Sequence, residues 1–169
     1  MAESILNDKR ILAVDDEPDV LAVLEAEIMR SCPRCTFDKA TTYEQAHELI
    51  QSWTYELIIL DIMGVRGFDL LEFAVAYHRP VVMLTAHALN PEALKRSIEM
   101  GARGYLPKES LGEVVPFLED VLKYENLTGW GRLLENLKGF FNTRWGENWK
   151  KVDEKFWKEF EEKIAFVKK

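Results

Sequence analysis

The sequence predicts an α/β fold, a doubly wound parallel sheet with helices on both faces. Five short apolar segments of strand length alternate with five segments of helical periodicity. Parallel strands need crossover connections, and right-handed crossovers place helices on both faces of one sheet. The apolar runs also end abruptly in polar residues, as expected of strands buried on both faces. The predicted strands are Arg10–Val14, Cys35–Ala40, Leu57–Leu60, Pro80–Leu84 and Arg103–Leu106.

The predicted helices have recognisable ends. Proline is well placed in a first helical turn, Thr and Asn side chains cap a helix start, and glycine ends a helix. These residues occur at the borders of the periodic segments, and Pro116 lies early enough in the last one to be tolerated. The expected helices run from Pro18 to about Arg30, from Thr42 through Ile50, over Phe68–Tyr77, from Asn90 to Gly101, and from Ser110 to Leu122.

Composition describes an ordinary soluble globular protein of 169 residues, with 47% hydrophobic and 30% charged residues. The segment 1–10 lacks the apolar core of a signal peptide, and no stretch is long enough for a membrane span, so we expect a cytoplasmic protein. The net charge of −7 divides into −9 for residues 1–124 (12 basic, 21 acidic) and +2 for residues 125–169 (10 basic, 8 acidic). Neither part resembles a nucleic-acid-binding patch.

The two cysteines, Cys32 and Cys35, form a single CxxC between a predicted helix and the next strand. A mononuclear zinc site needs about four ligands, and no second pair or well-placed histidine completes one. A redox pair is expected near the start of a helix that follows a strand. Two reduced thiols at a connection are therefore the simpler interpretation, with a metal or redox role as the alternative.

Acidic residues follow two of the predicted strands. Asp15 and Asp16 come after the first strand and Asp61 after the third, at the edge where ligands collect in open parallel sheets. Carboxylates this close need a cation to stay ionised, and Mg²⁺ is the natural oxygen-seeking partner. One carboxylate could then attack a phosphoryl group. Thr85 and Lys108, after the fourth and fifth strands, could contact the phosphoryl oxygens.

Residues 8–123 resemble a receiver domain of the two-component response regulators. The resemblance lies in four segments in the family's order: AVDDEP at 13–18, LIILDIMG at 57–64, VVMLTA at 81–86 and GARGYLPK at 101–108. It implies a flavodoxin-like sheet with strand order 2-1-3-4-5. It also implies that Asp61 is the phosphoacceptor.

The resemblance further implies roles for the neighbouring residues. Asp16, Asp61 and the main-chain carbonyl of Met63 would hold Mg²⁺ directly, and Asp15 would hold it through water. Thr85 and Lys108 would contact the phosphoryl group, and Tyr105 would be the aromatic switch residue that turns inward when Asp61 is phosphorylated. Met63 and His87 would flank the path of a hydrolytic water, and since Met63 cannot orient water, we expect a persistent phosphoryl group.

The chain departs from the family near the site. No proline follows Asp61 closely, and Gly67 comes early, so we expect this loop to differ in shape from that of the family. Pro107 precedes Lys108 instead of following it, so a cis Lys-Pro bond cannot form there.

The resemblance ends near Glu125, and the sequence therefore divides into a receiver domain at 1–124 and an amphipathic helical pair at 125–169. The first helix is expected over Thr128–Phe141, broken by residues 142–146, and the second over about 147–168. The pair could cap the receiver, form a homodimer, or dock a protein target. DNA binding and membrane contact fit poorly. The expected inner residues are Trp130, Leu133, Leu134, Leu137, Phe140 and Phe141, and then Trp149, Val152, Phe156, Phe160, Ile164 and Val167.

These observations predict a phosphorylation-dependent signalling switch rather than an enzyme. Its partner would be a histidine kinase or phosphotransfer protein, and its catalysis would be limited to self-phosphorylation and slow autodephosphorylation. The alternatives are a phosphotransferase or phosphatase that uses an aspartyl phosphate, and a non-phosphorylated interaction module. Turnover of an external phosphate ester would favour the former, and failure to bind Mg²⁺ the latter.

Overall fold

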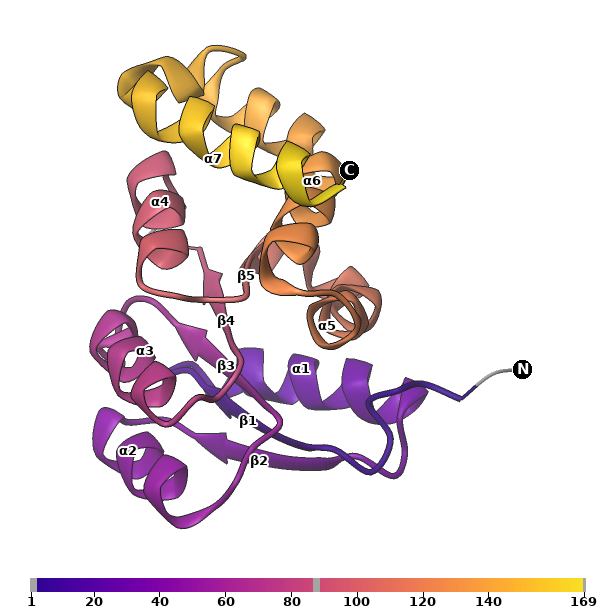
Figure 1. The fold of residues 1–169 in the computed structure, drawn as a ribbon. Coiled ribbons are helices and arrows are strands. Elements are labelled where there is room, and N and C mark those ends of the chain that lie inside the picture. Colours follow the sequence, from indigo (N-terminus) through magenta and orange to yellow (C-terminus); the bar gives the residue numbers. More distant parts are fainter. Residues whose placement is uncertain (1–2, 87–88, 169) are drawn as a thin grey trace.

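The computed structural model describes residues 3–86 and 89–168 and contains the predicted five-stranded parallel sheet. The strand order is β2-β1-β3-β4-β5, which confirms the expected order (Figure 1). The strands are β1 (Arg10–Val14), β2 (Thr36–Ala40), β3 (Leu57–Asp61), β4 (Val81–Thr85) and β5 (Gly104–Pro107). The helices are α1 (Pro18–Ser31), α2 (Tyr43–Ser52), α3 (Gly67–Ala76), α4 (Pro91–Glu99), η1 (Lys108–Glu113), α5 (Val114–Lys123), α6 (Asn126–Trp145), η2 (Trp149–Asp153) and α7 (Glu154–Lys168).

The sheet has an apolar layer on each face. One layer joins strand side chains to α1 and α5, through residues such as Leu24 and Leu118. The other joins them to α2, α3 and α4, through residues such as Ile50, Leu71 and Leu94. Every residue of β3 and β4 is buried, as expected of central strands covered on both faces.

Local capping explains several helix starts. The Thr42 hydroxyl accepts a hydrogen bond from the amide of Gln45 at 3.2 Å, and the Asn90 side chain accepts one from Ala93 at 2.8 Å. Gly101, with φ of +95°, ends the turn after α4 as predicted. The predicted start at Ser110 is wrong in detail, because Lys108–Glu113 is a 3₁₀ helix and the α-helix begins at Val114.

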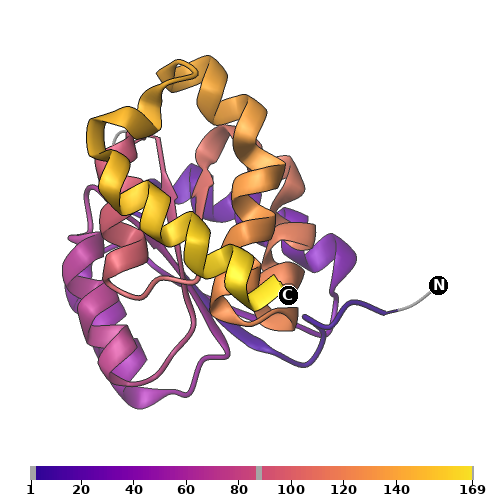
Figure 2. The same cartoon turned by 45° about the horizontal axis from the view of Figure 1, so that its top comes forward.

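The C-terminal helices α6 and α7 pack together at the α4 and β5 end of the sheet (Figures 1 and 2). Their buried residues belong to the same apolar cluster as the α2–α4 face. Trp130 is fully buried, and its indole N–H donates to the carbonyl of Ala102 at 3.0 Å. Helix α5 ends at Lys123, next to the predicted domain boundary at 124, and the division into two domains stays a prediction.

Two expectations about this helical pair are wrong. The first helix continues through residues 142–145 and ends at Trp145, just before Gly146, where φ is +84°. Asn142 is satisfied inside this helix, because its carbonyl accepts from Gly146 and its side chain accepts from the Trp149 indole at 3.2 Å. The second helix is divided into η2 and α7.

The inner face of η2 and α7 also differs from the predicted one. Val152 is 84% exposed and Val167 is 44% exposed, whereas Trp157 is buried. The 3₁₀ turn at η2 shifts the helical phase, so the spacing of an uninterrupted α-helix does not hold across it. This explains the exposure of Val152, whereas Val167 lies at the end of α7, beyond the buried Ile164.

Cys32 and Cys35 are both buried and carry free thiols. Burial, with the nearby Cys32 and Glu56, raises the pKa of Cys35 to about 11. Such a thiol stays protonated at neutral pH, which disfavours both redox chemistry and metal binding.

No helix among the described residues is long and apolar enough to cross a membrane.

Candidate functional site

The register of the strands brings the predicted site residues to one edge of the sheet. Val14 pairs with Leu60, so Asp15 and Asp61 leave adjacent strands side by side. Asp61 is opposite Leu84, the residue before Thr85. Thr85 is opposite Pro107, the residue before Lys108. The carboxyl ends of four strands therefore converge on one place.

Three carboxylates form the centre of this edge. One oxygen from each of Asp15, Asp16 and Asp61 lies within 4.8 Å of the others. Asp15 is fully buried and Asp61 is 2% exposed, whereas Asp16 faces solvent. Gly64 passes so close to Asp16 that a Cβ at this position would be 2.5 Å from the carboxylate carbon. With φ of +87°, Gly64 also has a backbone conformation that other residues rarely adopt.

Lys108 contributes the positive charge of the site. Its Nζ is 2.9 Å from Asp15 Oδ2, 3.4 Å from Asp61 Oδ1 and 3.0 Å from Glu17 Oε1. The Lys108 side chain is only 9% exposed, so these contacts are poorly screened by water. A single ammonium group thus faces two buried carboxylates and one exposed one.

The local electrostatics raise the pKa values of both buried carboxyl groups. Burial, with the nearby charge of Asp15, raises the pKa of Asp61 to about 7, against the opposing effect of Lys108. Burial likewise raises the pKa of Asp15, again opposed by Lys108. Although burial favours the neutral amine, the adjacent carboxylates of Asp15 and Glu17 hold the pKa of Lys108 above its ordinary value. The positive charge of Lys108 therefore does not balance the carboxylates of the cluster.

This donor set fits a divalent cation. Within the described residues, Asp15 Oδ2 is buried without a hydrogen-bond donor in good geometry, although the Lys108 ammonium is 2.9 Å away. Three closely spaced carboxylates, one of them open to solvent, provide the oxygen ligands that Mg²⁺ prefers. The site can accordingly hold a hard cation next to Asp61.

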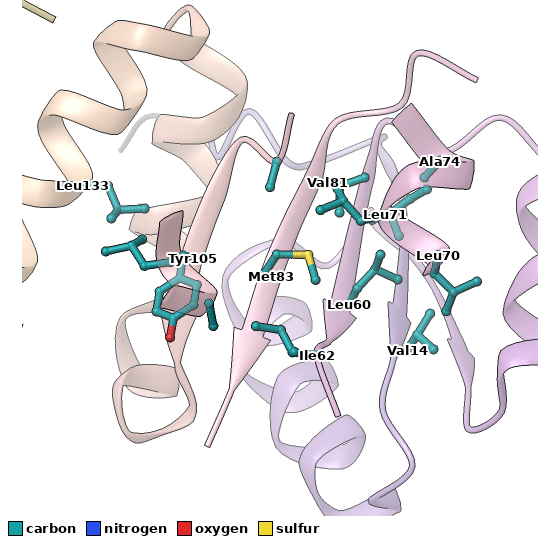
Figure 3. Packing of buried hydrophobic residues seen from close by; sticks show 14 of the residues in the cluster. Val14, Leu60, Ile62, Leu70, Leu71, Ala74, Val81, Met83, Tyr105 and Leu133 are labelled. Atoms are coloured by element: carbon teal, nitrogen blue, oxygen red, sulfur yellow. The ribbon is translucent and has the colours of Figure 1, made fainter. Parts of the chain in front are cut away.

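Thr85 and Tyr105 lie beside this centre on β4 and β5. Both are fully buried, and burial raises the pKa of the Tyr105 phenol. Figure 3 shows the Tyr105 side chain between Met83 of the sheet and Leu133 of α6. Its ring centroid is 6.3 Å from that of Phe141, also in α6. The predicted switch residue is thus covered by the C-terminal helices.

The remaining predicted residues are less informative. The side chain of Met63 is 52% exposed on the loop after β3, and His87 lies outside the described residues. Sequence analysis missed Glu17, whose amide donates to Asp15 Oδ1 at 2.9 Å while its side chain contacts Lys108. The sequence does contain a sign of its role, because Glu17 directly continues the acidic run of Asp15 and Asp16 after the first strand.

Comparisons with known proteins relate the first two thirds of the chain to one family. The sequence pattern of the response regulator receiver domain matches residues 11–115. The two-component response regulator ARR18 of Arabidopsis thaliana is 33% identical over 132 residues, which are 74% of this chain and 20% of that protein. A gliding motility regulatory protein of Myxococcus xanthus is 31% identical over 108 residues, which are 61% of this chain and 14% of that protein. The chain thus aligns with a minor part of these relatives.

Solved structures show the same fold. A response regulator receiver domain protein (CheY-like) from Methanospirillum hungatei JF-1 has a TM-score of 0.57 at 24% identity, covering 68% of this chain and 96% of that one. A response regulator protein from Burkholderia pseudomallei, with a phosphorylated aspartic acid, calcium ion and citrate, has a TM-score of 0.55 at 21% identity. That match covers 64% of this chain and 66% of the other. At these identities the likeness concerns the fold alone.

Proposed function

The chain belongs to the response regulator receiver family, and on that premise we propose that it is a phosphorylation-dependent signalling switch whose phosphoacceptor is Asp61. The observation that carries this proposal is the position of Asp61, which is buried beside Asp15 at the carboxyl ends of the strands, with the Lys108 ammonium group 3.4 Å from its carboxylate. The donor is a phosphohistidine of a histidine kinase or phosphotransfer protein, and the compartment is the cytoplasm, as expected from the sequence.

The phosphoryl transfer follows from the side chains around Asp61. A carboxylate oxygen of Asp61 attacks the phosphorus of the phosphohistidine, the O–P bond forms, and the P–N bond breaks as the imidazole leaves. Asp16, Asp61 and the Met63 carbonyl would hold Mg²⁺ directly, and Asp15 would hold it through water; the ion would supply positive charge beside the carboxylates and the phosphoryl oxygens. Lys108 then faces an additional anion, and the Thr85 hydroxyl can donate to a phosphoryl oxygen.

Signalling follows from the two-state behaviour of the surrounding elements. Movement of Thr85 towards the phosphoryl group changes the packing next to Tyr105, and Phe141 of α6 contacts that ring. A change at Asp61 is thus transmitted to the α4, β5 and α5 side of the domain. Output runs through protein contacts rather than through turnover of a substrate.

The test is the phosphorylation of the purified chain by acetyl phosphate, a small phosphodonor, with Mg²⁺. Intact-mass spectrometry should show one added phosphoryl group in the wild type and in Asp120→Asn, a control on α5 whose partly buried carboxylate pairs with Arg132. The adduct should be absent in Asp61→Asn and in excess EDTA. An adduct that persists in Asp61→Asn, or none in the wild type, would contradict the proposal.

The same preparation separates the alternatives. Continuous release of p-nitrophenol from p-nitrophenyl phosphate, dependent on Asp61, would instead indicate a phosphatase. Absence of both Mg²⁺ binding and adduct formation would indicate a non-phosphorylated interaction module.

A further inference from the structure

The C-terminal end of α6 touches both loop regions that follow the phosphoryl-binding residues. The Trp145 indole N–H donates to the carbonyl of Leu89, just before α4, at 3.2 Å. Arg144 pairs with Glu109, the residue after Lys108, and its Nη1 is 3.2 Å from Glu109 Oε1. The last turn of α6 thus reaches the chain beyond Thr85 and the chain beyond Lys108.

The rest of α6 is anchored differently. Near its start, Trp130 is fully buried and bonded to Ala102, before β5. Between α5 and α6 there is a cavity of about 270 Å³, lined by apolar residues such as Phe117 and Leu137. This space borders residues 129–137 in the first half of α6, and Phe141, one turn before Trp145, is buried as well. The part of α6 that can shift is therefore its last turn, beyond Phe141.

We propose that Arg144 and Trp145 are positioning residues, which hold the segments beside Thr85 and Lys108 in the unphosphorylated arrangement and are released when Asp61 is phosphorylated. This inference rests on the proposed function of Asp61. Thr85 and Lys108 must both close on the phosphoryl group, and that movement draws their neighbours Leu89 and Glu109 away from the last turn of α6. Phosphoryl binding and the docking of this turn therefore oppose each other.

The opposition has a reciprocal consequence that can be measured. If a phosphoryl group weakens the α6 contacts, loss of those contacts must strengthen binding of a phosphoryl mimic by the same factor. A coupling of ordinary size corresponds to about 5-fold or more in affinity. A contact with a purely structural role would not give this result, because here removal of the contact is expected to increase the affinity for the phosphoryl mimic.

The experiment is a calorimetric titration of the full chain with beryllofluoride in saturating Mg²⁺. Arg144→Gln removes the ion pair, and Trp145→Phe removes the indole donor while keeping an aromatic ring. Both should bind the mimic about 5-fold or more tightly than the wild type. Lys95→Met breaks the ion pair of α4 with Asp153, which joins the receiver to η2 away from these segments, and should leave the affinity unchanged.

Two further measurements make the test decisive. The double variant Arg144→Glu with Glu109→Arg should return the affinity to that of the wild type, because it restores the ion pair in reverse. Hydrogen–deuterium exchange should show faster exchange at the last turn of α6 when the mimic binds. Unchanged affinities in Arg144→Gln and Trp145→Phe, or slower exchange at this turn, would overturn the inference while leaving the proposed function intact. Failure of the wild type to bind the mimic would overturn both.

Discussion

The receiver part and the C-terminal helical pair are built from different side chains. The sheet is packed mainly with aliphatic residues such as Ile58 and Leu60, and its polar groups are gathered at strand ends. The helical pair is packed with rings in a continuous series of contacts, from Phe141 through Trp149 to Trp157. The buried polar side chains of the described residues, Asp15, Asp61, Thr85 and Ser97, all belong to the first part. The chemistry thus lies in the receiver, and the helical pair contributes contact surface.

The largest expected effect tests whether the two parts are one cooperative unit. Trp130→Ala should lower the free energy of unfolding by about 3–5 kcal/mol, because it removes a fully buried ring from the shared core. Trp53→Ala is the matched control, since Trp53 is 49% exposed and mainly covers Arg10, and it should cost about 1 kcal/mol or less. Denaturant titration followed by circular dichroism measures both. If Trp130→Ala lost only helical signal, while the sheet unfolded at its original denaturant midpoint, the two parts would not be one cooperative unit.

A second prediction concerns the pH dependence that the carboxylate cluster gives to the receiver. In EDTA, the stability of the wild type should fall as pH rises from about 4 to about 7. The folded state keeps a proton on Asp61 up to about pH 7, whereas an unfolded Asp loses it near 3.8, so the folded state binds more protons throughout this window. The fall should be on the order of 3 kcal/mol, from a pKa raised from 3.8 to about 7.

Asp61→Asn should remove most of this fall, and Asp69→Asn, on the surface of α3, should retain it. Denaturant midpoints measured from pH 4 to pH 7 show whether stability falls or rises with pH in each protein. The same pH dependence of stability in the metal-free wild type and in Asp61→Asn would contradict the raised pKa of Asp61.

A third prediction concerns the loop after β3. Gly64→Ala should destabilise the protein by about 1–2 kcal/mol, because of its positive φ, and should weaken Mg²⁺ binding by displacing Asp16. Gly112→Ala, where a Cβ meets nothing within 4 Å, should leave Mg²⁺ affinity unchanged. Calorimetric Mg²⁺ titration compares the two, and equal affinities would show that Gly64 does not set the position of Asp16.

The smallest expected effect lies in the helical pair. Val152→Ser should change the free energy of unfolding by less than about 0.5 kcal/mol, because this side chain is 84% exposed. Trp157→Ala, nearby and buried, should be clearly destabilising. Denaturant titration measures both variants. A large loss of unfolding free energy in Val152→Ser would mean that the Val152 side chain faces the core instead of solvent.

The two parts also differ in how far the sequence predicts them. In the receiver, the apolar runs and the polar residues at their ends predict both the sheet and the convergence of Asp15, Asp61, Thr85 and Lys108, because parallel strands leave little freedom in where their ends lie. Helical periodicity predicts an apolar stripe in α6 but contains no information about its partner. The contacts of Arg144 and Trp145 with Glu109 and Leu89 join residues distant in sequence, and no local pattern marks them.

In the helical pair, tertiary contacts also outweigh the low helix propensity of one segment. Residues 142–145 contain Asn and Thr, which are poor helix formers, and this composition favoured a break. The helix persists because Asn142 and Trp145 find hydrogen-bond partners outside their own turn. In the receiver such conflicts are fewer, and propensity and packing give the same boundaries to within a residue or two except at the start of α5, which lies four residues after Ser110.

The position of β5 at one end of the sheet has a consequence for association between chains. An uncovered edge strand offers unpaired backbone groups to the strands of other molecules and is a common origin of aggregation. Here the edge strand is only four residues long and has α6 beside it. The opposite edge, β2, carries the charged residues Asp38 and Lys39, which disfavour such pairing. Removal of the C-terminal helices should therefore reduce colloidal stability, and a receiver without them would need a partner or a second copy to protect β5.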